Sequence, residues 1–307
     1  MSPGWLLLVV AYLLVAPGIL VLGPLAGLLL VARPVSRQAW ITIVLALVWC
    51  LLWLVQREAL PFQFLRAYSV AVIGAWVLLV PRAPGRGLRQ AALAIAVAGA
   101  VTFGWMMVLG IRWGDVESAT ARWVSSMFLK EARLADQLWG EAGSQLSAPL
   151  FELAGQARMM VQLVPAALVI TTLAGLALAW RGHFALAAQP LAPAPRPLAA
   201  FTFGDHAVWL VVMSLAVLLI PGGKSVPGAE QVAVNVLLVM LALYAFRGAA
   251  VFRAGAGRVS PMGIVLYTVL TILMFAFVAS GLTVLGLADT WLDFRRRMAP
   301  TTGGTER

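Results

Sequence analysis

The sequence predicts an all-α fold, a polytopic transmembrane helix bundle of about eight spans, placed in the cell membrane. Of its 307 residues, 62% are hydrophobic and only 11% are charged, and the mean hydropathy is +0.94. A soluble domain carries about 25% charged residues. This chain therefore cannot cover a core with polar surface, and we expect the lipid bilayer to be its solvent.

The apolar residues gather in runs long enough to cross a membrane, which takes about 20 residues of helix. Each run must be helical, because unpaired backbone groups in lipid are costly. Tryptophans near the ends of the runs fit the headgroup region. The predicted spans are 5–32, 39–55, 64–81, 91–111, 161–180, 206–220, 231–253 and 261–285.

The first run, 5–32, has no Lys or Arg before it and is too long for the apolar core of a signal peptide, so we expect a retained membrane segment. It contains Pro17, Gly18 and Pro24. Either a kinked, tilted helix or two short helices would accommodate them.

Residues 112–160 are predicted to form an amphipathic helical insertion between spans four and five, since they hold half of the twelve acidic residues. Asp115 is a plausible N-cap, and Gly140 and Gly143 would end the helix before Ser147 starts a second one. Such a helix lies on the membrane or folds back over the bundle. Its apolar positions at helical spacing are Val116, Trp123, Met127, Leu134 and Leu138.

The Pro/Ala-rich segment 183–205 predicts an extended linker between two membrane halves, because four prolines favour a semi-rigid connector. The N-terminal half is 1–182, and the C-terminal half is 206–307 with a basic juxtamembrane tail. The basic loops and the basic C-terminal tail both indicate the cytoplasmic side of the membrane. A single straight crossing at 261–285 cannot place both of them there. We expect either a bend near Ser280-Gly281 or an error in one span.

Composition also excludes several classes of function. The arginines behind the net charge of +10 are scattered between apolar runs, which favours control of topology over binding of nucleic acid. The single cysteine, Cys50, permits neither an intrachain disulfide nor a thiolate metal cluster. Ser280 has no histidine mid-span to act as its base. We therefore predict no catalytic residue, no metal and no cofactor.

Polar side chains on the seventh span are the candidates for solute binding. Asn235 lies near its start, and Tyr244 and Arg247 share one helix face. Polar groups at membrane depth are costly and usually face a cavity or a partner. Arg247 could also lie at the interface with its charge in water. At the start of the sixth span, Asp205 and His206 fit a helix cap better than a proton relay.

The charged motif after the last span is LGLADTWLDFRRR, residues 285–297. On a continuous helix Asp289, Asp293 and Arg296 share a face, and Asp293 precedes Arg296 and Arg297 at the spacing of helical ion pairs. Together with Arg295, these residues indicate a charged juxtamembrane helix. Two carboxylates one turn apart could instead hold Mg²⁺ against a diphosphate.

A row of small residues marks one face of the fourth span. It would allow another helix to approach closely, as an internal seam or as a docking face for a subunit, and we favour the internal seam. The row consists of Ala92, Ala96, Ala100 and Gly104.

Three stretches, FTFGDHAVW, NVLLVMLALYAFRGAAVFR and LGLADTWLDFRRR, resemble the YybS-like family of uncharacterised bacterial integral membrane proteins. They cover the C-terminal third of the chain. That family is distantly similar to the S subunits of energy-coupling-factor transporters, which carry an alanine-rich contact face on their first helix. The resemblance implies a place in the bacterial inner membrane and no particular reaction.

The first functional hypothesis is transport-related: a small solute binds within the helix bundle, and a partner membrane subunit supplies energy, since no GxxxxGK[ST] loop occurs in the sequence. The alternative is a membrane scaffold or assembly partner for envelope proteins, acting through 112–160. A third is an enzyme on a lipid-linked substrate that uses Asp289 and Asp293, although the sequence favours a role other than catalysis.

Overall fold

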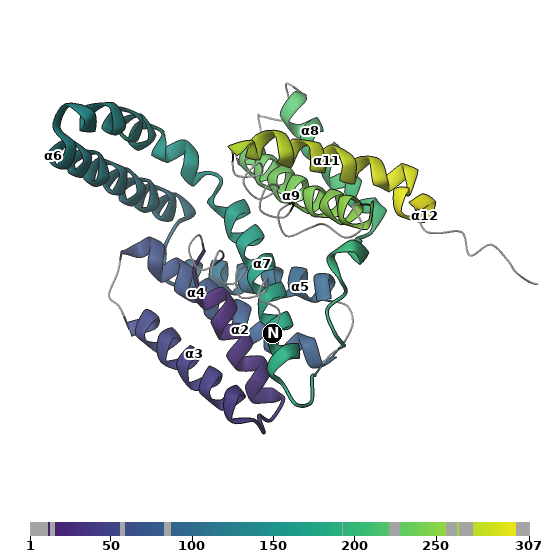
Figure 1. Ribbon diagram of the computed structural model, residues 1–307. Helices are drawn as coiled ribbons and strands as arrows, with labels where there is room; N and C mark the ends of the chain where they lie inside the picture. The colour runs from purple at the N-terminus through teal and green to yellow at the C-terminus, as the bar shows by residue number, and fades with distance from the viewer. Residues whose placement is uncertain are drawn as a thin grey trace, which may run out of the picture. The chain divides into compact units, whose positions relative to one another are not determined.

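The computed structural model describes residues 12, 16–55, 59–82, 87–191, 193–220, 228–255, 263 and 273–298. All regular structure within these ranges is helical (Figure 1). The chain divides into two compact units, Met1–Pro195 and Arg196–Arg307. The division falls inside the Pro/Ala-rich segment 183–205.

Unit 1 is a helix bundle built around the short helix α2 (Ile19–Val31). The membrane-spanning candidates of this unit are α3 (Arg37–Val55), α4 (Leu60–Leu79, continued by η1, Val80–Arg82), α5 (Gly87–Val108) and α7 (Val164–Leu186). Helix α2 packs against α3, α4 and α7, and most of its side chains are buried. Gly23 and Gly27 allow this central position, because a Cβ at either would collide with Ile73 or Val77 of α4.

The helical insertion is confirmed as α6 (Trp113–Val161), which Gly140 divides into two arms that lie side by side (Figure 1). Gly140 has φ 53° and ψ −124°, a conformation open almost only to glycine. The predicted details were partly wrong. Arg112 is the N-cap, and Asp115 accepts a hydrogen bond from its N–H at 2.9 Å. Gly143 and Ser147 both lie inside the second arm.

Unit 2 consists of η2 (Leu198–Ala200), η3 (Asp205–Ala207), α8 (Val208–Leu219), α9 (Ala229–Gly255), α11 (Phe275–Leu292) and α12 (Phe294–Met298). Helix α9 is central and packs against α8 and α11. Because α7 extends to Leu186 and η2 begins at Leu198, the connector is shorter than the segment 183–205.

Within the described ranges, six helices are long and apolar enough to span a membrane, namely α3, α4 with η1, α5, α7, α9 and α11. Two shorter apolar helices, Ile19–Val31 and Asp205–Leu219, overlap the first and sixth predicted spans. The predicted bend near Ser280-Gly281 is wrong, because α11 runs through both residues. Residues 264–272 of the predicted span 261–285 lie outside the described residues, as do residues 1–11.

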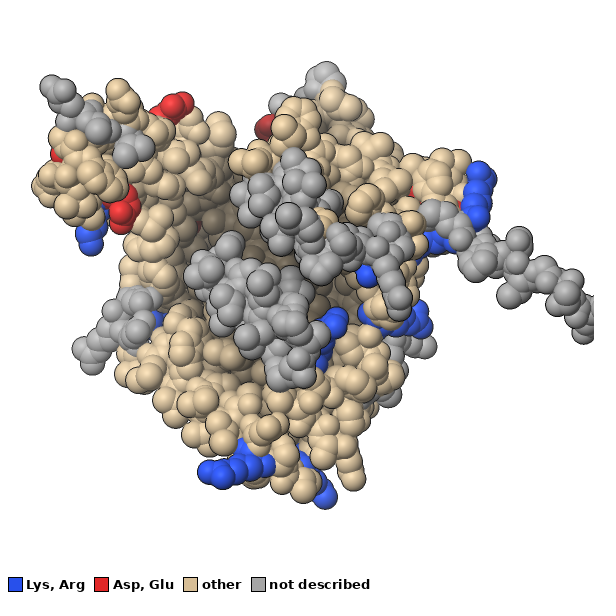
Figure 2. All heavy atoms as spheres, in the orientation of Figure 1, with Lys and Arg blue, Asp and Glu red and all other residues tan. Residues whose placement is uncertain are grey.

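The outer surface of the bundle is apolar, as lipid exposure requires. Many large apolar side chains of α3 are exposed, such as Leu45 and Leu52. Figure 2 shows an uncharged surface over much of this bundle, with Lys and Arg at the end where α2 and α3 meet. The small-residue row of α5 also faces outward: Ala92, Ala96, Ala100 and Gly104 are exposed, whereas Ala91, Ala94, Ala98 and Thr102 form the internal seam. The preference for an internal seam was therefore wrong.

Candidate functional site

Four charged side chains of unit 2 form one cluster, which we call the ion cluster: Asp205, Arg247, Asp289 and Arg295. Arg247 Nε donates to Asp289 Oδ2 at 3.0 Å, and its Nη1 donates to Asp205 Oδ1 at 2.9 Å. Arg295 Nη2 donates to the same Asp289 Oδ2 at 2.7 Å. Two guanidinium groups thus share one carboxylate oxygen, and the four formal charges sum to zero.

Burial divides the ion cluster into an inner and an outer part. The Asp289 side chain is 0% exposed and that of Arg247 is 7% exposed, whereas that of Asp205 is 66% exposed. A buried charge is tolerated only when it is paired and hydrogen-bonded. Loss of either partner of the inner pair would therefore leave a buried charge without full compensation, while Asp205 contributes little because water screens it.

Aromatic side chains enclose Arg247. Its guanidinium lies 5.6 Å from the centre of the Phe203 ring, within range of a cation–π interaction. Phe203 packs edge-to-face against Tyr244, with ring centres 5.0 Å apart. The carbonyl oxygen of Phe201 accepts from Arg295 Nη1 at 2.9 Å. The residues just before α8 are therefore part of the cluster's wall.

Two glycines bring α9 and α11 close enough for the inner pair to form. A Cβ on Gly248 would collide with the backbone of Leu282, and one on Gly286 would collide with the backbone of Tyr244. Small residues at a crossing let membrane helices approach until their backbones touch. Gly248 follows Arg247 directly, so the crossing point also sets the distance to Asp289.

The chain turns sharply at Asp293, which overturns one prediction. Asp293 has φ 44° and is the left-handed C-cap of α11, after which α12 begins. Asp289, Asp293 and Arg296 therefore do not share the face of one continuous helix. The turn instead returns Arg295 to Asp289. Arg297 follows on α12, where its N–H donates to the carbonyl of Asp293 at 3.4 Å.

This arrangement does not form the carboxylate pair that Mg²⁺ would need. Asp289 Oδ2 already accepts from two guanidinium groups, and Asp293 lies beyond the helix end. No group of three or more metal-binding side chains occurs among the described residues. The chemistry of the ion cluster is therefore cross-linking of helices by buried charge.

The three predicted solute-binding residues are separated by the structure. Tyr244 and Arg247 are buried at the ion cluster. Asn235 donates to the carbonyl of Gln231 on its own helix at 2.8 Å, and about 18 Å of helix separates it from Arg247. Their role in binding a solute stays a prediction. Sequence reasoning did not predict that Arg247 pairs with Asp205. The presence of this acid just after the aromatic residues FTF could have indicated such a pairing.

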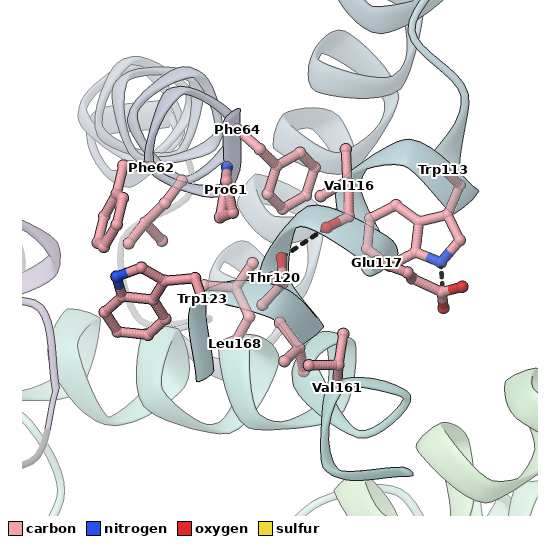
Figure 3. A pocket seen from close by; sticks show the side chains of 12 residues that line it. Pro61, Phe62, Phe64, Trp113, Val116, Glu117, Thr120, Trp123, Val161 and Leu168 are labelled. Carbon is pink, nitrogen blue, oxygen red and sulfur yellow. Dashed lines mark hydrogen bonds between the residues drawn. The ribbon is translucent and has the colours of Figure 1, made fainter. Parts of the chain in front are cut away.

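A cavity of about 150 Å³ lies in unit 1 between α4, α6 and α7 (Figure 3). Two aromatic pairs form part of its wall: Phe62 packs edge-to-face on Trp123, and Phe64 packs on Trp113, with ring centres 5.0 and 5.5 Å apart. The other lining residues are Pro61, Leu65, Val116, Glu117, Thr120, Val161, Val164 and Leu168. We call this cavity the apolar pocket.

Two polar groups of the apolar pocket have hydrogen-bond partners within α6. Trp113 Nε1 donates to Glu117 Oε1 at 2.7 Å, and Thr120 Oγ1 donates to the carbonyl of Val116 at 2.6 Å (Figure 3). The rest of the wall is mainly hydrocarbon and aromatic carbon. Such a pocket selects apolar groups, and one of similar size lined by apolar residues takes benzene.

Comparison with known proteins identifies the family. The sequence model of the family described as "Predicted membrane protein (DUF2232)" matches residues 5–290. The chain belongs to this family. The DUF2232 match runs from before α2 to residue 290 within α11, and includes the apolar pocket and all of the ion cluster except Arg295. The predicted YybS-like membrane family and the multi-pass membrane location are thereby confirmed.

No curated protein and no solved structure matches the chain. The distant similarity to energy-coupling-factor S subunits stays a prediction. The family establishes a multi-pass membrane protein and leaves its activity to be argued from the site.

Proposed function

We propose that this protein is transport-related, and that it binds a small apolar or amphipathic solute in the apolar pocket of unit 1. The observation that carries the proposal is the pocket itself, which is lined mainly by apolar and aromatic side chains, with Trp113 Nε1 and Thr120 Oγ1 hydrogen-bonded within α6. A partner membrane subunit would supply the energy, since the sequence has no GxxxxGK[ST] phosphate-binding loop.

The position of the apolar pocket fits an amphipathic solute. Pro61 lies in the first turn of α4, Trp113 begins α6 and Val164 begins α7. The pocket is therefore at the level where two membrane-spanning helices begin, near the border between hydrocarbon and water. A solute there could insert its apolar part between the rings and keep its polar end hydrated.

Photolabelling of the full-length protein in lipid nanodiscs tests this proposal. The probe is a hexanol that carries a diazirine, and labelled peptides are identified by mass spectrometry. We expect label on the pocket-lining parts of α4 and α6, and the variant Leu168→Trp, which fills the pocket, should reduce it about tenfold, equivalent to about 1.4 kcal/mol.

The matched control is Val101→Trp, since Val101 is 55% exposed on the outer surface of α5. It should leave the labelling of the pocket unchanged. Equal labelling of the pocket peptides in wild type and in Leu168→Trp would contradict the proposal.

A further inference from the structure

An open surface groove of about 350 Å³ lies along the two arms of α6 and is separate from the apolar pocket. We call it the arginine groove. The first arm, 113–139, contributes Arg122, Ser125 and Ser126, and the second, 141–161, contributes Arg158. The rest of its lining is small or apolar: Ala121, Leu129, Ala154, Gly155 and Ala157.

The hairpin geometry brings the two arginines to the same groove. Arg122 and Arg158 lie equally far from Gly140 along the sequence, one on each arm, and antiparallel arms place such positions opposite each other. The seam between the arms is made of small residues, including the buried Ala154 and Ala157. The arms therefore approach closely, and the two positive charges face one groove.

Neither guanidinium has an ion pair or hydrogen bond with another residue in the described part of the chain. No acidic side chain lines the groove among the described residues. Two like charges held together without a counter-charge repel each other, and an anion between them removes that cost. Elsewhere in the protein, at the ion cluster, two arginines share Asp289. Among the side chains that the structure describes, no such acid lines the arginine groove.

We propose that the arginine groove binds a phosphate group between Arg122 and Arg158. A guanidinium presents a planar fork of N–H donors that matches two phosphate oxygens, and two such forks can hold one phosphate from both sides. The hydroxyl of Ser125 can add a further donor. The phosphate belongs either to an anionic lipid headgroup beside the hairpin or to a free solute. This site is independent of the solute proposed for the apolar pocket.

The test uses the full chain in two settings. Titration calorimetry in neutral detergent measures binding of inorganic phosphate, at an ionic strength held constant with chloride. Native mass spectrometry of protein released from nanodiscs measures retention of phosphatidylglycerol against phosphatidylcholine. We expect the double variant Arg122→Gln and Arg158→Gln to lose at least tenfold in whichever binding the wild type shows, since charge-assisted hydrogen bonds are broken.

The control is Arg133→Gln, which removes an exposed arginine of the same arm that does not line the groove. Phosphate binding lost in the double variant and kept in the control identifies a free phosphate as the ligand. Loss of phosphatidylglycerol alone identifies a lipid headgroup. Equal binding in wild type, double variant and control, or equal loss in the control, overturns the proposal. Helical circular dichroism confirms that each variant is folded.

Discussion

The role of Arg247 in unit 2 depends on the side chains that it contacts. Arg247 could have been the ligand of a solute or an interfacial arginine, and its sequence neighbours do not decide between these roles. The structure pairs it with Asp289, which is buried, and with Asp205, which is exposed. Since an unpaired buried charge is far more costly than an exposed one, the two carboxylates should differ sharply in their effect on stability.

We therefore predict that Arg247→Leu destabilises the protein by about 3–5 kcal/mol, because it leaves Asp289 buried with part of its charge unpaired. Asp205→Asn should cost less than about 1 kcal/mol. The double variant Arg247→Leu and Asp289→Leu should recover part of the loss. Thermal unfolding in a fixed detergent measures all three. Equal losses for Arg247→Leu and Asp205→Asn would show that the inner pair is not the stabilising one.

Among helices, the crossing of α9 and α11 determines whether the ion cluster can form. At Gly248 and Gly286 the two backbones touch, with no room for a side chain. A larger residue would push the helices apart and lengthen the hydrogen bonds between Arg247 and Asp289. Formation of the ion cluster therefore depends on the two glycines, which set the distance between the helices that carry Arg247 and Asp289.

We predict that Gly248→Ala lowers the stability of the protein by about 1–3 kcal/mol, as overpacking of a close contact does. The matched control is Gly281→Ala on α11, where a Cβ meets no atom within 4 Å. That change should be neutral or stabilising, because alanine favours the helix. Thermal unfolding compares the two variants. A similar loss in both would indicate a general effect of alanine, contrary to the crossing argument.

The whole molecule is organised by its solvent. Large apolar side chains cover the outside of unit 1, among them Leu45, Leu52 and Met107. A contiguous surface of this kind is stable in hydrocarbon and aggregates in water. Because hydrocarbon offers no hydrogen-bond partners, polar groups inside the bundle must pair with each other. One example is the hydrogen bond from Tyr12 Oη to the carbonyl of Thr171 at 2.9 Å.

We predict that the protein stays in the membrane fraction after washing with alkaline carbonate, and that detergent releases it as a monodisperse species. Removal of the detergent should cause aggregation, which size-exclusion chromatography would detect. Release by carbonate alone, or a monodisperse protein in plain buffer, would contradict a lipid-exposed surface.

Sequence reasoning predicted the class of fold and most of the spans, since length and hydropathy are properties that each segment carries alone. It also predicted the insertion of α6 and its break at Gly140. It misplaced Asp115 and the small-residue row of α5, because the cap and the facing of a helix depend on neighbours that a single segment does not show. The same limit hid the turn at Asp293, which no residue preference signals strongly.

By itself, the amino-acid sequence determined that the chain is a multi-pass helical membrane protein, since its apolar runs can be solvated only by lipid. Only the tertiary structure decided which side chains meet. It joined Asp205, Arg247, Asp289 and Arg295 across four elements, formed the apolar pocket between α4, α6 and α7, and placed Arg122 beside Arg158. Such contacts arise where helices far apart in the sequence cross, and the hydropathy of a single segment does not predict which helices cross.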